Sequence, residues 1–120
     1  AEGTIDYYDR VVKEVGGGYR HVKEFARLFM APGVAHCGGG TGPMPQNLFD
    51  YLVDWVENGV APETILASKD MGGGMTQTRP LCPYPDLAVW TGHGSTDDAA
   101  NFVCKHGKIN FAHDKRQTKP

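Results

Sequence analysis

A histidine and a cysteine stand side by side in a stretch whose composition suits a reactive loop. His36 and Cys37 follow an apolar segment and the dipeptide Pro32-Gly33, and three glycines come directly after them. The apolar segment predicts a buried strand over residues 26–31, which Pro32-Gly33 ends. His36 then lies beyond the carboxyl end of a strand, where open α/β sheets usually carry their chemistry. Histidine can take up and return a proton near neutral pH, although a purely structural histidine with one backbone partner fits these residues equally well.

Other nucleophiles are less well placed in this chain. Neither Ser68 nor Ser95 lies in the Gly-x-Ser-x-Gly pattern of a serine nucleophile, and Ser95 is predicted to cap a helix that starts with acidic residues. A thiol protease would need the Cys37 sulfur to face the His36 ring. Side chains of adjacent residues rarely point at each other, so we do not favour a thiol protease.

The histidines and glycines predict neither a metal site nor a phosphate loop. No two histidines have His-x-x-x-His spacing, and there is no Cys-x-x-Cys pair. The glycine-rich residues 38–42 lack the Lys-Ser/Thr ending of a P-loop. The five histidines are His21, His36, His93, His106 and His113.

The predicted elements around His36 alternate between helix and strand. A helix begins near Thr4, with apolar residues on one face, and ends at the glycines 16–18. A second helix covers about residues 46–57 and also carries an apolar stripe. The order helix, strand, histidine loop, helix favours an α/β sheet.

The second half of the chain is less regular. Residues 64–68 predict a short edge strand, whereas glycines 72–74 and Pro80, Pro83 and Pro85 predict loops. Residues 97–102 have helical potential. From Lys105 onward the sequence is polar and basic, which predicts disorder near its end.

Composition excludes several classes of protein. A chain of 120 residues is one domain's length, and a net charge of -2 gives no electrostatic case for binding nucleic acid or an anionic membrane. No apolar run is long enough to span a bilayer. The chain opens on Ala1-Glu2-Gly3 without a methionine, so we expect a piece of a longer protein or a processed product. In an oxidising compartment three cysteines would form one pair and leave one thiol over.

Three motifs occur in order along the chain. They are Phe-Met-Ala-Pro-Gly-Val-Ala-His-Cys-Gly-Gly-Gly at 29–40, Arg-Pro-Leu-Cys-Pro-Tyr-Pro at 79–85 and Gly-Ser-Thr-Asp-Asp-Ala-Ala-Asn-Phe-Val-Cys at 94–104. Together they resemble the C-terminal part of the tannase and feruloyl esterase family, over residues 3 to about 104. The family comprises secreted serine hydrolases of the α/β-hydrolase type with a large lid domain, including relatives that act on terephthalate monoesters.

The resemblance implies roles for four residues. His36 matches the histidine of the catalytic triad, the base that would deprotonate the serine and later protonate the leaving alcohol. Cys37 matches a cysteine that is disulfide-linked to one immediately before that serine. Cys82 and Cys104 match a second, local disulfide. The serine, the aspartate, the oxyanion hole and a structural calcium site in the lid would all lie upstream of Ala1, so we expect no cofactor or metal within this chain.

The resemblance also implies an organisation and a function. Residues 1–68 would be a C-terminal α/β-hydrolase segment, 69–104 a disulfide-stapled, loop-rich extension, and 105–120 a polar tail. The expected function is that of a fragment or subunit of a secreted or periplasmic esterase, with the N-terminal part of that esterase as partner and a small aromatic ester as substrate. The chain alone would be inactive. The alternative is a non-catalytic, folded or self-associating module, since an unpaired strand at 27–31 would favour pairing with another copy.

Overall fold

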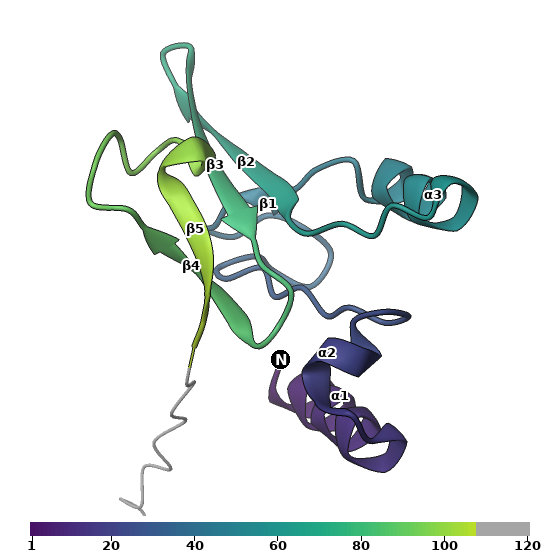
Figure 1. Ribbon diagram of the computed structural model, residues 1–120. Helices are drawn as coiled ribbons and strands as arrows, with labels where there is room; N and C mark the ends of the chain where they lie inside the picture. Colours follow the sequence, from purple (N-terminus) through teal and green to yellow (C-terminus); the bar gives the residue numbers. More distant parts are fainter. Residues whose placement is uncertain (108–120) are drawn as a thin grey trace, which may run out of the picture.

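Two helices, two small antiparallel sheets and a projecting third helix make up the described part of the chain, residues 1–107 of a computed structural model (Figure 1). In chain order the elements are α1 (Glu2–Val15), α2 (Gly18–Val22), β1 (Met44–Pro45), α3 (Leu48–Asn58), β2 (Ile65–Gly72), β3 (Met75–Leu81), β4 (Asp86–Trp90), the 3-10 turn η1 (Ala99–Asn101) and β5 (Phe102–His106). The first part of the predicted polar tail therefore belongs to β5, and residues 108–120 of that tail lie outside the described residues.

Helix α1 follows its predicted apolar face but starts earlier than predicted. Its N-cap is Ala1 rather than Thr4, and its buried residues are Ile5 and Tyr8. The helix ends at Gly16, which has a φ of 78° and whose N–H donates to the carbonyl of Val12. The glycine stop was therefore predicted correctly, and the cap was not.

Helix α3 agrees with the predicted second helix to within two residues at each end. It runs from Leu48 to Asn58, and Gly59 ends it in the left-handed conformation, with φ 71°. None of its residues is buried. Figure 1 shows α3 projecting from the body of the fold, and Phe49, Leu52 and Val56 of its apolar stripe are exposed.

The larger sheet has the strand order β1-β2-β3 and is antiparallel throughout. The predicted edge strand at 64–68 is wrong in length and place, because β2 runs to Gly72 and is the central strand. The loop predicted at Pro80 is also wrong, because Pro80 lies in β3, opposite Leu66. Proline is tolerated on β3 because β3 is an edge strand, where one side needs no ladder bonds.

The smaller sheet pairs β4 with β5 and is tied to the larger one by a disulfide. Cys82 follows β3 directly, and Cys104 lies in β5 opposite Ala88. The two cysteines are bonded, with their Cα atoms 5.7 Å apart. The predicted helix over 97–102 is only the three-residue turn η1, after which the chain becomes β5.

The predicted strand at 26–31 is not a strand in the described structure. The segment makes a single bridge, between Phe29 and Pro83, and Tyr84 N–H donates to the carbonyl of Leu28 over 2.7 Å. Pro83 has no N–H to continue a ladder, which limits the pairing to this bridge. No described strand pair is parallel, and residues 26–31 make no pairing within residues 1–107 beyond this bridge.

Two small apolar clusters hold the fold together. One packs α1 and α2 against Tyr84, and the other packs the β2–β3 pair against Phe29 and Tyr51. Of the described helices, none is long and apolar enough to cross a membrane.

Candidate functional site

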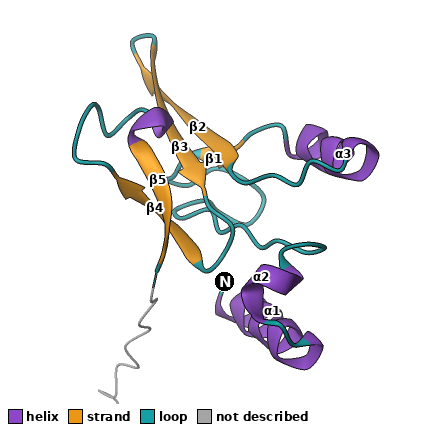
Figure 2. Ribbon diagram, in the orientation of Figure 1, coloured by secondary structure: helices purple, strands orange, loops and turns teal. Residues whose placement is uncertain are grey.

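A long loop segment joins α2 to β1 (Figure 2). Within it, His36 lies at the tip of a tight hairpin. Gly38 N–H donates to the carbonyl of Ala35 over 3.1 Å, which makes His36 and Cys37 the two central residues of a four-residue turn. Below the turn, Val34 pairs with Gly40. Gly42 N–H then donates to the carbonyl of Gly33 over 2.9 Å and closes the stem.

Glycine is required at two positions of the stem because its two limbs touch. A Cβ atom at Gly40 would collide with the carbonyl oxygen of Gly33, and one at Gly42 would collide with that of Pro32. Gly40 also has a φ of 95°, which side chains disfavour. These glycines let the backbone turn sharply at the histidine, as expected of a loop that presents one side chain.

The His36 side chain is exposed and touches the sulfur of its neighbour. Its Nδ1 lies 3.2 Å from Cys37 Sγ, and both residues are on the surface. The expectation that these two side chains point apart is therefore wrong, because the turn places them on the same side. Cys37 is the one unpaired cysteine of the chain. Among residues 1–107 Nε2 of His36 has no hydrogen-bond partner, so this nitrogen is open to a reacting group.

Three separate contacts hold the hairpin to the rest of the fold. The incoming limb follows the bridge between Phe29 and Pro83, next to the disulfide. The outgoing limb leads into β1, where Met44 pairs with Ser68 of β2. Lys69 Nζ donates to the carbonyl of Thr41 over 2.7 Å. No pattern in the sequence pointed to Lys69.

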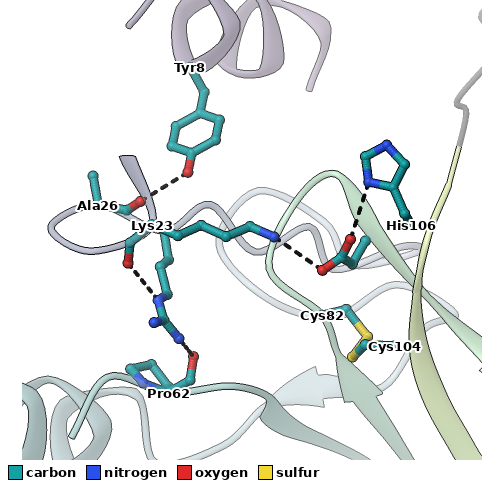
Figure 3. A network of polar contacts seen from close by, with 9 residues as sticks. Tyr8, Lys23, Ala26, Pro62, Cys82, Cys104 and His106 are labelled. Atoms are coloured by element: carbon teal, nitrogen blue, oxygen red, sulfur yellow. Dashed lines mark hydrogen bonds and ion pairs between the residues drawn. A yellow bond between two sulfur atoms is a disulfide. The ribbon is translucent and has the colours of Figure 1, made fainter. Parts of the chain in front are cut away.

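A charged network joins the helical part to the sheets (Figure 3). Lys23 Nζ lies 3.1 Å from Asp86 Oδ2, and His106 Nδ1 lies 3.5 Å from Asp86 Oδ1. Arg27 donates to the carbonyls of Lys23 and Pro62. The contacts of Asp86 bind the segment after α2 to β4 and β5, and the bond from Arg27 to Pro62 binds the same segment to the loop before β2. Both have a structural role.

A carboxylate surrounded by tyrosines holds α1 to α2 and to the turn before β4. Tyr19 donates to Asp9 Oδ1 over 2.7 Å, and Tyr84 donates to Asp9 Oδ2 over 3.3 Å. Burial and the hydrogen bond to Asp9 raise the pKa of Tyr19. Burial, followed by the charge of Asp9, raises the pKa of Tyr84. Both hydroxyls therefore stay protonated as donors, and neither is a base.

The remaining candidates serve local structure. Ser95 Oγ accepts from the N–H of Asp97, so it caps a turn, while Asp98 caps η1. Ser68 lies inside β2. His21 contacts Glu24. Within residues 1–107 no three histidine, cysteine or acidic residues gather to hold a metal ion; His113 lies outside the described residues.

Comparison with known proteins identifies the family. The family model described as tannase and feruloyl esterase matches residues 1–105. The chain is 42% identical to the mono(2-hydroxyethyl) terephthalate hydrolase of Piscinibacter sakaiensis, over 84% of this chain and 17% of that protein. It is also 42% identical to a probable feruloyl esterase of Arthroderma benhamiae, over 86% of this chain and 20% of that protein.

A solved structure that resembles this chain is also an esterase. The crystal structure of an esterase from Aspergillus oryzae superposes with a TM-score of 0.79 and 32% identity, over 88% of this chain and 24% of that one. The chain thus spans no more than a quarter of the length of each of these three proteins. The chain belongs to the tannase and feruloyl esterase family.

Proposed function

We propose that this chain is the C-terminal part of a secreted serine esterase that hydrolyses esters of aromatic carboxylic acids, with His36 as its general base. Family membership supports an ester hydrolase. The two named relatives act on a terephthalate ester and on feruloyl esters, and both acids are aromatic. The observation that carries the proposal is the exposed imidazole at the tip of a hairpin in which close approach of the two limbs demands glycine.

The proposed chemistry divides the triad between this chain and the longer part of the enzyme. His36 takes the proton of a serine hydroxyl as that oxygen attacks the ester carbonyl, and returns it to the leaving alcohol. The serine, the aspartate that orients the imidazole and the donors of an oxyanion hole are contributed from outside this chain. Removing any of these parts from an esterase lowers its rate by several powers of ten. The isolated chain is therefore expected to have no esterase activity.

The experiment compares histidine variants in a protein that joins this chain to its preceding part. Hydrolysis of methyl ferulate and methyl gallate is measured for the parent, for His36→Gln and for His93→Gln. The first variant is expected to lose about 10⁴-fold or more in kcat. The second is expected to keep its rate, because His93 lies in an exposed loop. Equal rates in all three proteins would overturn the role of His36.

The exposed thiol gives an independent test of the assembly. We propose that Cys37 forms a disulfide with a cysteine of the preceding part, next to the serine nucleophile. Intact mass of the joined protein after alkylation without reductant is expected to show no label on Cys37, whereas the isolated chain takes up one label there. A labelled Cys37 in the active joined protein would contradict this disulfide.

Self-association remains the second candidate, and the uncovered stripe of α3 favours it. The segment 27–31, predicted as an unpaired strand, makes one bridge, to Pro83. Phe49 and Val56 are nevertheless 74% and 75% exposed. A helix face of this kind is covered either by the rest of an enzyme or by another copy of the chain.

A further inference from the structure

We propose that Lys69 is a positioning residue for His36, which it holds in place through the backbone of the hairpin. The inference rests on the proposed role of His36. Lys69 does not touch the imidazole; its ammonium group donates to the carbonyl oxygen of Thr41, on the outgoing limb. Thr41 lies between Gly40 and Gly42. These are the two glycines of the outgoing limb that lie against the backbone of the incoming limb.

The contact joins a well-held strand to a loop with few other restraints. β2 is the central strand of its sheet, and Lys69 lies opposite Gln77 of β3. The hairpin contains four glycines between residues 38 and 42, whose backbones lose more freedom on ordering than those of other residues. Within residues 1–107, Lys69 is the one side chain outside the hairpin that hydrogen-bonds to residues 33–42. This bond is therefore the one side-chain hydrogen bond by which the rest of the described chain holds the hairpin.

The chemistry of the contact suits an anchor. A donor that carries a charge makes a stronger hydrogen bond than a neutral one. Lys69 is half-buried, and it forms no ion pair with any residue in the described part of the chain. Its ammonium group is thus directed to the Thr41 carbonyl rather than shared with a carboxylate.

The consequence for catalysis follows from the geometry of proton transfer. A general base must lie within hydrogen-bond reach of the hydroxyl that it deprotonates, and a shift of about 1 Å can cost about 100-fold in rate. If the stem loosens, His36 spends less time in reach of the serine. The expected effect is on kcat, while substrate binding and KM stay nearly unchanged.

The first measurement uses the joined esterase, because the isolated chain is expected to associate through α3. Amide hydrogen exchange is followed by NMR for Gly42, whose N–H closes the stem, and for the ladder of β2 and β3. Lys69→Met, which keeps the aliphatic stem but loses the donor, is expected to speed exchange of Gly42 about tenfold. The ladder should exchange as before. Lys69→Arg should restore the slow rate, and Lys105→Met, an exposed lysine of β5, should change nothing. Unchanged exchange at Gly42 in Lys69→Met, or a failure of Lys69→Arg to restore it, would overturn the inference.

The second measurement uses the joined esterase. Lys69→Met is expected to lower kcat about tenfold with little change in KM, and Lys69→Arg is expected to recover it. A failure of the proposed function is seen separately, as a parent activity that His36→Gln leaves intact. If His36→Gln abolishes activity while Lys69→Met keeps the full kcat, the proposed function stands and the role of Lys69 is wrong.

Discussion

The hydroxyl groups of Tyr19 and Tyr84 both point at one carboxylate, and this makes their protonation part of the fold. Each donates to Asp9, and the two rings pack edge to face with centroids 5.8 Å apart. The pKa of each hydroxyl is raised above its ordinary value, chiefly by burial. Deprotonation would place a phenolate against Asp9 and remove the donor at the same time.

The sign of the resulting pH dependence is fixed by these raised values. The unfolded chain releases its tyrosine protons near pH 10, whereas the folded chain holds them to higher pH. Above that pH the unfolded state binds fewer protons, so the free energy of unfolding falls as pH rises. We expect full stability from this cluster below pH 10 and a progressive loss above it, measured by urea unfolding at a series of alkaline pH values with Cys37 alkylated.

Phenylalanine variants separate this cluster from the other tyrosines. Tyr19→Phe is expected to be less stable than the parent at neutral pH and to show a shallower decline at alkaline pH. Tyr7→Phe is the control, because Tyr7 lies on α1 with 67% of its surface exposed. A decline as steep in Tyr19→Phe as in Tyr7→Phe would show that the cluster does not carry the pH dependence.

At the scale of single elements, the helices were predictable and the strands largely were not. The periodicity of α1 and α3 is local, and the glycines at 16 and 59 end them where the sequence indicates. β2 pairs with β1 on one side and with β3 on the other, so that Ser68 lies between Met44 and Thr78. Met44 is far from β2 along the chain and leaves no local pattern, so β2 was predicted as an edge strand. The hairpin between β2 and β3 is local, but Pro80 predicted a loop after the glycine turn, so β3 was missed.

The same contrast applies to the candidate site. The turn at His36 follows from Pro32, Gly33 and the glycines after it, so its loop character was predictable. The anchor at Lys69 was not, because its partner is a backbone carbonyl 28 residues away. A backbone acceptor is the same at every residue type, so the sequence contains no pattern for such a bond.

The disulfide adds a covalent link between the two sheets of the second half of the chain. It joins the end of β3 to β5 and so closes the loop that contains β4 and the turn at 91–98, with a sequence separation of 22. On the chain-entropy model such a closure stabilises the fold by about 3 kcal/mol. We expect the double change Cys82→Ala and Cys104→Ala to lower the free energy of unfolding by that amount, measured by urea unfolding with circular dichroism.

Cys37→Ala is the matched control for this loss, since it removes the exposed, unbonded cysteine. It should leave the unfolding free energy within about 0.5 kcal/mol of the parent, as is usual for surface changes. A double variant that unfolds too easily to measure agrees with the expectation. A double variant as stable as Cys37→Ala would mean that the contacts between β3 and η1 already hold the two sheets together.

The described part of the molecule buries few of its large apolar side chains. Its Cα radius of gyration is 16.5 Å, whereas a compact domain of about 100 residues has a value of about 13 Å. Among the described residues, Val22 is the one large side chain that is completely buried. An open, mainly apolar groove of about 780 Å³ runs between the start of α1 and the β4–β5 sheet. These features are expected of a part that completes its core against a larger partner.

The apolar stripe of α3 leads to the last prediction. In water, Phe49 and Val56 are expected to drive association of the isolated chain, because covering them removes apolar area from solvent. The pair Phe49→Glu and Val56→Lys leaves the net charge unchanged and suits the helix dipole at each end of α3. Light scattering should show a mass that rises with concentration for the parent and stays at that of one chain, 13.1 kDa, for this variant.

A second pair of exposed residues decides whether α3 or apolar exposure in general causes the association. Met71→Lys and Met75→Glu change two exposed side chains at the β2–β3 turn, again without altering the net charge. This control should associate as the parent does, because its apolar groups are not aligned along one helix face. Circular dichroism should show the same helix content in all three proteins, since neither pair removes a buried contact. A parent that stays monomeric at high concentration would mean that the stripe on α3 is too small to recruit a second copy, and self-association of the chain would then be excluded.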